Sequence, residues 1–599
     1  MTASAPIPDA DLWARINRDI VAKAISELAY EEAFAPVATH GGGTRWELAL
    51  SGGVTYRFEA VRRIWGQLSI RPESLRRCAE TDEPVSDAVA FFVDANGELG
   101  MAPDTLATYA KELYSTLVAD ARLAARTTEE TADALAAMPD QALQCRLEGH
   151  PKAPANKGRI GWGLEDFRAY APEFEPDIRL FWVAADRETC RMALGRDTEE
   201  ETLLAHAMDG QDRARLEEAR HRAGVPDGSH MLLPVHPWQW DHMIAPQFAG
   251  EIAAGRIVPL GSFGDPYRPQ QSLRTLANAA RAHALHVKLP ITVLNTSAWR
   301  GVPGRYMAIG ATLSDWLADA AASDPVLAPV KVLREVAGAF YPHPHYERIA
   351  DVPYQFREML GAIWRESPEA GLPAGHRPMM AGALAQRDGA GRPVASALVA
   401  RSGLSHEAWI DRLFATVVVP LYHFMCRYGV GFIAHGQNVS VILDGDVPAG
   451  VAVKDFQGDL DLVADDFPEL ATLPAAVRET LKRRPPDHLV HHLQTGHFVS
   501  VLRFLSDALA SHDGLDETVF YRVLADRLRQ YQESHPELAA RYALFDLFQP
   551  EIPRIRINRV RFAIGYGDAG ERPVPALGSA LANPLHSVRR PVGREAVSA

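Results

Sequence analysis

"HGQNVSVILDGDVPAGVAVKDFQGD", residues 435–459, places polar side chains at both ends of two apolar runs. The alternation on either side of Asp444–Ala449 predicts an antiparallel hairpin with that segment as its loop. In this register Asn438 lies opposite Asp455, and opposed residues share one face with side chains about 5 Å apart. An amide oxygen beside a carboxylate suits Mg²⁺, which keeps several waters and bridges phosphates. A shift of one residue would send Asp455 to the other face.

Two interpretations of this hairpin are open. In the first, Asn438 and Asp455 are metal ligands, as in the pairing of a catalytic-loop Asn with a downstream Asp in protein kinases. The second element of this chain reads Lys454-Asp455-Phe456, and such a site would also serve a small-molecule kinase. In the second interpretation both residues only cap turns, and His435 is structural. The hairpin needs support from elsewhere in the chain.

A second polar cluster lies in "QQSLRTLANAARAHALHVKLPITVLNTSAWRGVPGR", residues 270–305. Ser272, Arg274 and Thr275 stand at the predicted start of a helix, where free N–H groups and hydroxyls receive anions. The guanidinium of Arg274 adds a two-pronged donor for phosphate oxygens. This part of the cluster predicts a phosphate site.

Three further residues of the cluster belong to a strand and its end. Lys288 lies in an apolar strand, where it either pairs with an acid or faces a ligand. Thr296 and Arg300 follow the strand, and Arg300 could grip a substrate carboxylate. Each basic residue taken singly fits a solvated surface role, but a hydroxyl-rich helix start, a strand Lys and a strand-end Arg together predict an anion-binding cleft.

Composition narrows the class of protein. The chain has 599 residues and a formal charge of −14, which opposes attraction to nucleic acid or anionic lipid. Its four cysteines, Cys78, Cys145, Cys190 and Cys426, lie far apart, so the sequence encodes no disulfide framework, zinc ribbon or iron–sulfur cluster. The N-terminus lacks the pattern of a secretion signal, and the most apolar window is too short to span a bilayer. We expect a cytoplasmic protein with no nucleic-acid or membrane partner.

The pattern along the chain predicts an α+β, mixed α/β, fold in three parts. Helices are predicted at 11–34 and 103–126, a strand pair at 46–60, a hairpin at 88–100, a capped helix from Ser405 to Tyr428 and a late strand at 553–562. The Pro-, Gly- and Lys-rich segment 148–163 predicts an irregular loop and a domain edge. We place an N-terminal domain at 1–160, a second domain with the phosphate and carboxylate motifs at 161–400, and a largely helical third domain with the hairpin at 401–599.

These pieces, taken together, resemble the nonribosomal-peptide-synthetase-independent siderophore synthetases. The matching stretches are "EGHPKAPANKGRIG", "LLPVHPWQW", "SLRT", "KLPITVLNTSAWR", "LGAIWRES", "HGQN" and "KDFQGD". The resemblance implies a hand-shaped enzyme with thumb, fingers and a distantly kinase-like palm. It implies an ATP- and Mg²⁺-dependent ligase that adenylates a carboxylic acid, releases pyrophosphate, and joins the acyl group to an amine or hydroxylamine with release of AMP. A homodimer is typical of relatives.

The resemblance also implies residue roles, and two of its features stay open. Carried over by motif, the ATP-binding residues are Ser272, Arg274, Thr275, Lys288, Gln437, Asn438 and Asp455, the metal ligands are Asn438 and Asp455, and the residues at the substrate carboxylate are Thr296, Arg300 and His435. His435, Arg300 and Lys288 would be the catalytic residues. Ile433 stands where many relatives have Glu, and the adenine-stacking Arg is unassigned among Arg365, Arg377 and Arg401. The acid is a succinyl-hydroxamate arm, as in the alcaligin and desferrioxamine branch, which the sequence most resembles, or a citrate derivative, and the product is linear or a ring.

Overall fold

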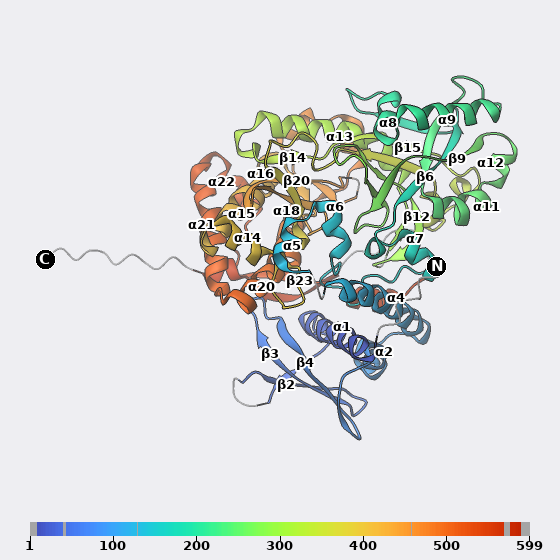
Figure 1. The fold of residues 1–599 in the computed structure, drawn as a ribbon. Helices are drawn as coiled ribbons and strands as arrows, with labels where there is room; N and C mark the ends of the chain where they lie inside the picture. Colours follow the sequence, from blue (N-terminus) through green and yellow to red (C-terminus); the bar gives the residue numbers. More distant parts are fainter. Residues whose placement is uncertain are drawn as a thin grey trace.

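The computed structural model describes residues 9–39, 43–127, 130–296, 298–456, 458–567 and 576–588 (Figure 1). As predicted, the chain is a mixture of helices and sheets. Figure 1 shows an N-terminal region at the bottom of the view, a region with a large sheet at the upper right, and a helix-rich region at the left. No helix in the described part of the chain has the length and apolar character needed to cross a membrane.

The N-terminal region packs a long helix against an antiparallel sheet. Helix α1 (Ala10–Tyr30) buries Ile16, Ile20, Ala24 and Leu28 at the four-residue spacing that predicted it. It begins at Asp9, whose carboxylate accepts the N–H of Leu12 at 2.7 Å. The strands follow chain order in the sheet: β1 (Val37–Ala38), β2 (Arg45–Ala49), β3 (Thr55–Arg62), β4 (Leu68–Cys78) and β5 (Asp82–Pro84). The second predicted helix is α4 (Pro103–Thr127).

The hairpin predicted at 88–100 is wrong. This segment forms α2 (Ala88–Asp94) and α3 (Asn96–Leu99). The buried residues Ala88, Phe91, Phe92 and Ala95 follow helical spacing, and the Asp87 side chain caps the helix by accepting the N–H of Ala90 at 2.9 Å. A short apolar run can follow either period, and here the cap decided between them.

The second region is built on an eight-stranded sheet in which every neighbouring pair is antiparallel. The strand order is β7-β15-β16-β11-β10-β9-β6-β8. The strands are β6 (Ile178–Asp186), β7 (Arg191–Leu194), β8 (His230–Val235), β9 (Ile257–Pro269), β10 (Thr275–Asn278), β11 (His286–Lys288), β15 (Glu335–Phe340) and β16 (Gly361–Arg365). The hairpin of β12 (Ile291–Asn295) and β13 (Ala298–Arg300) leads from this sheet to helix α13 (Gly304–Ser323).

The third region surrounds a four-stranded sheet of order β14-β20-β19-β17. Its strands are β14 (Val330–Val332), β17 (His376–Met380), β19 (Val439–Asp444) and β20 (Val447–Val453). The predicted helix from Ser405 is α15 (His406–Leu413), a π-helical turn and α16 (Val419–Tyr428). Ser405 caps the N-terminus, and Gly429 ends the helix in the left-handed conformation. Further helices include α14 (Val394–Ser402), α20 (Arg503–Asp513) and α21 (Glu517–Ser534).

The β19–β20 hairpin exists, but the register predicted for it is wrong by one residue. Its turn is the pair Gly445–Asp446 rather than the longer segment Asp444–Ala449. Val439 pairs with Val453, and the N–H of Lys454 donates to the carbonyl of Asn438 at 3.1 Å. Asp455 therefore does not lie opposite Asn438. The dipeptide Gly445-Asp446, one of the pairs typical of two-residue hairpin loops, was the signal for the shorter loop.

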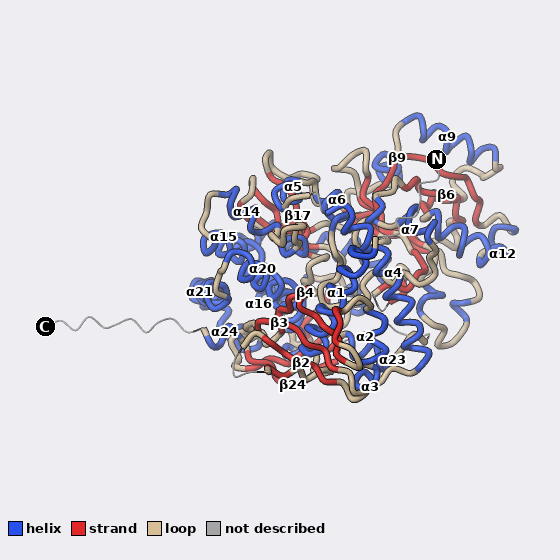
Figure 2. Tube along the Cα trace, turned by 60° about the horizontal axis from the view of Figure 1, so that its bottom comes forward, coloured by secondary structure: helices blue, strands red, loops and turns tan. Residues whose placement is uncertain are grey.

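The C-terminal segment returns to the N-terminal region. Strand β23 (Glu551–Arg556) pairs with β24 (Ala576–Ala582), and the rest of the strand predicted at 553–562 is instead helix α23 (Asn558–Ile564). In Figure 2 the labels α23 and β24 lie in the lower part of the view with those of the N-terminal elements, and Arg556 of β23 pairs with Glu32, just after α1. The ring of Phe562 on α23 packs against Phe92 and Tyr109 of the N-terminal core, with centroids 6.4 and 5.1 Å apart. Residues 551–564 thus help to stabilise the N-terminal region.

A buried ion cluster ties α1 to the third region. The carboxylate of Glu27 accepts hydrogen bonds from Lys152 Nζ at 3.0 Å and from Arg503 Nη2 at 2.7 and 2.8 Å. All three side chains are at most 2% exposed. Burial opposes the charge of Glu27, but the attraction of Arg503 and Lys152 holds the pKa of its carboxyl below the ordinary value.

Replacing Glu27 with Ala should therefore destabilise the protein strongly. The substitution leaves two buried cations without their counter-ion, which costs about 3–5 kcal/mol. Urea denaturation monitored by tryptophan fluorescence measures the loss. The matched control is Glu165→Ala, because the Glu165 side chain is 93% exposed in its pair with Arg168 and should contribute about 0–1 kcal/mol. Equal shifts in the two variants would contradict a structural role for the cluster.

Candidate active site

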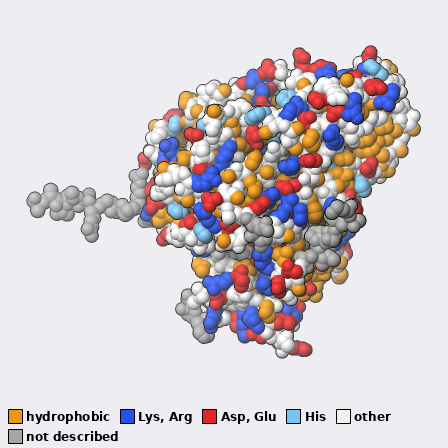
Figure 3. Space-filling view, viewed as in Figure 1, with side chains coloured by type: hydrophobic (Ala, Val, Ile, Leu, Met, Phe, Trp, Pro, Cys, Tyr) orange, Lys and Arg blue, Asp and Glu red, His pale blue; other side chains and the backbone are white. Residues whose placement is uncertain are grey.

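A large cavity of about 1920 Å³ opens where the three regions meet. Its walls come from α1, β3 and β4, from the loop at 147–159, from the β12–β13 hairpin and the start of α13, and from segments 380–387, 433–437 and 500–511. Twelve Lys and Arg residues line it against nine Asp and Glu residues, although the chain carries a formal charge of −14. On the face in Figure 3 both signs are interspersed. Positive charge is thus concentrated in the cavity, which favours anionic ligands.

His435 and Gln437 line the cavity at the turn that precedes β19. The N–H of Gln437 donates to Nδ1 of His435 at 3.2 Å, so the neutral ring carries its proton on Nε2. Burial lowers the pKa of His435 below its usual value, although Asp459 and Asp455 oppose the shift. At neutral pH the ring is therefore an uncharged hydrogen-bond donor at the cavity wall.

Asn438 lies directly behind this turn, where it is 4% exposed. Its Nδ2 donates to Asp459 Oδ2 at 3.0 Å and to the carbonyl of Ile433 at 3.3 Å. Its Oδ1 is buried and has no hydrogen-bond partner among the described residues. A buried orphan oxygen beside a carboxylate fits a hard cation that retains water. The described residues contain no group of three or more His, Cys, Asp or Glu that could hold a metal by themselves.

Asp455 lies in the same wall and neutralises two buried cations. Its Oδ1 accepts hydrogen bonds from Lys288 Nζ at 2.6 Å and from Arg365 Nη1 at 2.8 Å. Burial opposes its charge, but Lys288, Arg365 and Lys454 hold the pKa of Asp455 well below the usual range. Oδ2 receives no hydrogen bond from the described residues. Burial lowers the pKa of Lys454 to about 8, assisted by Arg365. The wall therefore contains more cationic groups than Asp455 alone can balance.

The helix predicted to start at Ser272 does not exist. Residues 270–274 form a turn, and Thr275 begins β10. The turn is closed by the N–H of Thr275, which donates to Ser272 Oγ at 3.1 Å, and Leu273 adopts a positive φ of 65°. Ser272 lines the cavity, the Arg274 guanidinium donates to the carbonyl of Gly301, and Thr275 pairs with Lys288 in the sheet. Strand pairing with β9 and β11 overrode the helical pattern.

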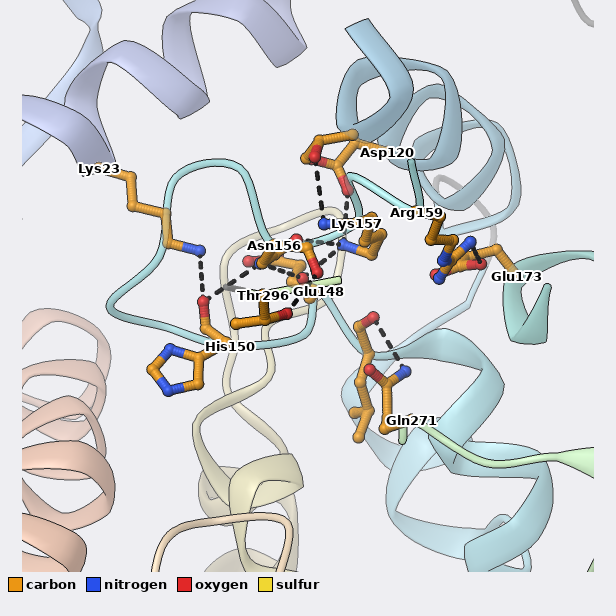
Figure 4. Close-up of polar contacts among 12 residues, drawn as sticks. Lys23, Asp120, Glu148, His150, Asn156, Lys157, Arg159, Glu173, Gln271 and Thr296 are labelled. Carbon is orange, nitrogen blue, oxygen red and sulfur yellow. Dashed lines mark hydrogen bonds and ion pairs between the residues drawn. The ribbon is translucent and has the colours of Figure 1, made fainter. Parts of the chain in front are cut away.

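Thr296 and Arg300 line the cavity from the β12–β13 hairpin, as predicted for residues at a strand end. Thr296 sits in the hairpin turn with φ 48°. Its Oγ1 donates to the carbonyl of Asn156 at 3.2 Å, which fixes the hairpin against the irregular loop predicted at 148–163. Figure 4 shows this loop folded between Thr296 and the N-terminal helices. Within the loop, Lys157 Nζ donates to Asp120 Oδ1 at 2.7 Å.

The residues predicted to form the site fall into two layers. Ser272, Thr296, Arg300, His435 and Gln437 line the cavity. The others, Arg274, Thr275, Lys288, Asn438 and Asp455, do not line it but lie in contact with the lining or with each other in the wall.

Sequence reasoning missed several cavity residues. Arg387 lines the cavity and makes no ion pair with the described residues, whereas none of the three candidates for adenine stacking, Arg365, Arg377 and Arg401, lines it. Arg365 is engaged with Asp455, and the other two with Asp446. Asp459 also lines the cavity, and its place in "KDFQGD" was a usable signal. Arg387 stands in no motif, so nothing in the sequence singled it out.

Comparisons with known proteins identify the family. Residues 140–386 match the model of the IucA / IucC family, and residues 407–569 match that of the ferric iron reductase FhuF-like transporter. The latter segment holds one cysteine, Cys426, which is buried. The chain is 43% identical to the aerobactin synthase of Escherichia coli over 96% of its own length and 98% of that protein.

Two solved structures share the fold. The aerobactin synthetase IucC of Klebsiella pneumoniae superposes with a TM-score of 0.87 at 40% identity, covering 97% of this chain and 100% of that one. The ATP-bound aerobactin synthetase IucA from the same species has a TM-score of 0.77 at 18% identity, covering 96% and 99%. The chain belongs to the IucA/IucC family of siderophore synthetases, which are ATP-dependent, amide-forming ligases.

Proposed function

We propose that this enzyme adenylates a carboxylic acid in the cavity and then condenses it with an amine or hydroxylamine, releasing pyrophosphate and AMP. The observation that carries the proposal is the meeting of Thr296, Arg300 and His435 in one cavity, backed by the buried cations Lys288 and Arg365. A carboxylate and a triphosphate repel each other, so cations and fixed donors must bring them together. A kinase-like phosphotransfer would need the same phosphate site but no acid-binding site.

The acid would bind at the β12–β13 hairpin. Arg300 supplies a two-pronged donor for the reacting carboxylate, the Thr296 hydroxyl turns from the Asn156 carbonyl to donate to it, and the neutral His435 ring donates from Nε2. These groups orient one carboxylate oxygen toward the α-phosphorus of ATP. The new bond joins that oxygen to phosphorus, and the bond to pyrophosphate breaks.

The nucleotide would occupy the wall between the second and third regions. Ser272 and Gln437, which line the cavity, would contact the phosphates, with Gln437 near the α-phosphate. Arg274, Thr275 and Lys288 would complete the phosphate site from the wall behind them. The base would lie against segment 380–387, where Arg387 has a guanidinium free of ion pairs that can stack on adenine. The ATP-bound relative with the same fold supports the use of ATP.

Mg²⁺ is proposed as the metal. Asn438 through its orphan Oδ1 and Asp455 through Oδ2 would hold it, with the carboxylate of Asp459 beside them. When bound, the ion screens the charge of the phosphates and of the departing pyrophosphate. Asp459 also supplies an acid close to Ile433, the position at which many relatives carry Glu.

The acid is proposed to be a citrate derivative, one of the two classes expected from the sequence. Arg305, at the start of α13, lines the cavity and makes no ion pair with the described residues. A second cation beyond Arg300 suits an acid with more than one carboxylate better than a succinyl-hydroxamate arm. Whether the product is linear or cyclic follows from the substrates.

The wider organisation is also proposed. We assign residues 1–160, 161–400 and 401–599 to thumb, fingers and a distantly kinase-like palm, with β14, β17 and α14 of the middle segment packed into the palm. We also propose a homodimer that works in the cytoplasm on small molecules. Size-exclusion chromatography with light scattering would measure the oligomeric state.

The reaction type can be measured directly. Purified protein with Mg²⁺ and citrate derivatives should exchange labelled pyrophosphate into ATP only when an acid is present, and complete turnover with an amine should yield AMP. A panel that includes succinyl-hydroxamates separates the acid classes. Production of ADP instead of AMP would indicate a kinase and overturn the proposal.

Arg300→Ala should abolish most of the acid-dependent exchange. Removing a preorganised donor from a developing charge costs about 10²–10³-fold in rate. The melting temperature should change little, because Arg300 lies at the cavity wall and not in the core. Arg357→Ala, another cavity arginine outside the assigned site, is the matched control. Retained exchange in Arg300→Ala would place the acid elsewhere.

Asp455→Asn should impair magnesium-dependent exchange and also lower stability. The amide keeps the shape of the carboxylate but leaves Lys288 and Arg365 without a counter-charge. We expect a loss of exchange at every Mg²⁺ concentration, together with a lower urea midpoint. Asp446→Asn, which removes a carboxylate bound to two arginines outside the cavity, is the control. Full exchange in Asp455→Asn would show that this carboxylate is not needed for ATP or metal.

A further inference from the structure

The cavity has a second polar wall that the adenylation step does not use. Asp19, Ala22, Lys23 and Ser26 line it from α1, together with Glu148 of the loop. Residues four apart share one face of a helix, so Asp19 and Lys23 face the cavity together. Pockets for a single small ligand usually have about 300–1,000 Å³. The volume of about 1920 Å³ therefore leaves room for another substrate beside nucleotide and acid.

This wall is joined to the acid site by a short series of hydrogen bonds (Figure 4). Lys23 Nζ donates to the carbonyl of His150 at 2.8 Å, and Asn156 Nδ2 donates to the same oxygen at 3.1 Å. Thr296 Oγ1 then donates to the carbonyl of Asn156 at 3.2 Å. A molecule held by α1 is thus placed next to the carboxylate that Thr296 would orient.

Asn295 gives an independent indication of a ligand. It immediately precedes Thr296, lines the cavity and is 5% exposed. The side-chain amide of Asn295 forms no hydrogen bond with the described residues, and its Oδ1 is buried without a partner among them. A buried polar group without a partner is unfavourable and is usually satisfied by a ligand, a water or another residue. A ligand with polar hydrogens at this position would satisfy it.

The charges of the wall define the kind of ligand. Glu148 and Asp19 are neighbouring carboxylates. Enclosure of the Asp19 carboxyl in the cavity and the nearby Glu148 raise its pKa, while part of the Asp19 side chain is open to solvent. Arg15, Glu73 and Asp120 also act on Asp19. Lys23 has no ion pair with the described residues, and burial with Lys157 nearby lowers its pKa to about 8. The carboxylates of Asp19 and Glu148 can bind an ammonium group, and the ammonium of Lys23 can bind an anionic group.

We propose that this wall binds the second substrate, a primary amine that carries an anionic group. Asp19 and Glu148 hold the ammonium, Lys23 holds the anionic group, and Asn295 accepts an N–H. The inference rests on the proposed function and names the site of its nucleophile. It also explains why the irregular loop at 148–163 connects α1 to Thr296.

In the condensation step, Asp19 and Glu148 take up the two protons that the amine must lose. The ammonium loses one proton to Asp19, and the nitrogen lone pair attacks the acyl carbon of the adenylate. The C–N bond forms, the C–O bond to AMP breaks, and AMP leaves with the electron pair. The nitrogen loses its second proton to Glu148, and both carboxylates pass their protons to water.

The experiment separates the two half-reactions in the full-length protein. Acid-dependent exchange of pyrophosphate into ATP reports adenylation, and amine-dependent AMP release reports condensation. Asp19→Asn should raise the KM for the amine at least tenfold and leave exchange within twofold of wild type. Lys23→Gln should abolish the preference for an amino acid over a plain diamine of equal length. The control is Asp11→Asn, on the exposed start of α1, which should change neither activity.

The outcomes distinguish an amine site at α1 from the alternatives. Unchanged amine KM in Asp19→Asn with unchanged selectivity in Lys23→Gln would overturn the assignment. A parallel loss of exchange and condensation would also overturn it, because α1 would then serve the nucleotide or the acid. If the wild-type protein shows no acid-dependent exchange, the proposed function fails and not only this inference.

Discussion

The contact between the Asp455 carboxylate and the cations Lys288 and Arg365 is the interaction on which the site depends. Burial lowers the pKa of Lys288, and Asp455 opposes that shift. The pairing keeps cations charged immediately behind the cavity wall, where water screens them poorly. It also joins β11 and β16 of the second region to the end of β20 in the third. The same three side chains thus set the field of the site and the relative position of the two regions that build it.

The N-terminal region completes the cavity from the opposite side. Ion pairs of Glu27 with Lys152 and Arg503 hold α1 against the loop at 148–163 and against α20. On the other side of the region, the Tyr109 ring of α4 packs against Phe562 of the C-terminal segment. Breaking one of these buried ion pairs would leave an unpaired charge, so α1 stays against the loop. The hydrogen bonds through His150 and Asn156 place Lys23 of α1 near Thr296. That arrangement lets one cavity serve adenylation at one wall and condensation at another.

Local sequence patterns predicted the elements whose signals are unambiguous. The α1 periodicity, the Ser405 cap with its Gly429 stop and the strand that carries Lys288 are confirmed. Thr296 and Arg300 line the cavity, and their roles there stay a prediction. The errors have two causes: a hydrophobic pattern that fits both helix and strand, and strand pairing that local sequence does not determine. Residues 88–100 fit a strand or a helix equally well. The turn at Ser272 depends on the pairing of β10 with β9 and β11, and the β19–β20 register depends on an irregularity between Ile442 and Leu443 that no pattern reveals. Arg387 and Asn295 could not be predicted from the sequence. Each is singled out only in the folded chain, Arg387 because it lines the cavity without an ion pair among the described residues, and Asn295 because its buried Oδ1 has no partner among them.

We propose that the acid attacks the α-phosphorus of ATP inside the cationic cavity. Isotope transfer tests it most directly. When the acid carries ¹⁸O in its carboxylate, the account predicts that one ¹⁸O appears in the AMP released during condensation, as measured by mass spectrometry. Recovery of the label in inorganic phosphate, with unlabelled nucleotide product, would show attack at the γ-phosphorus and contradict the account.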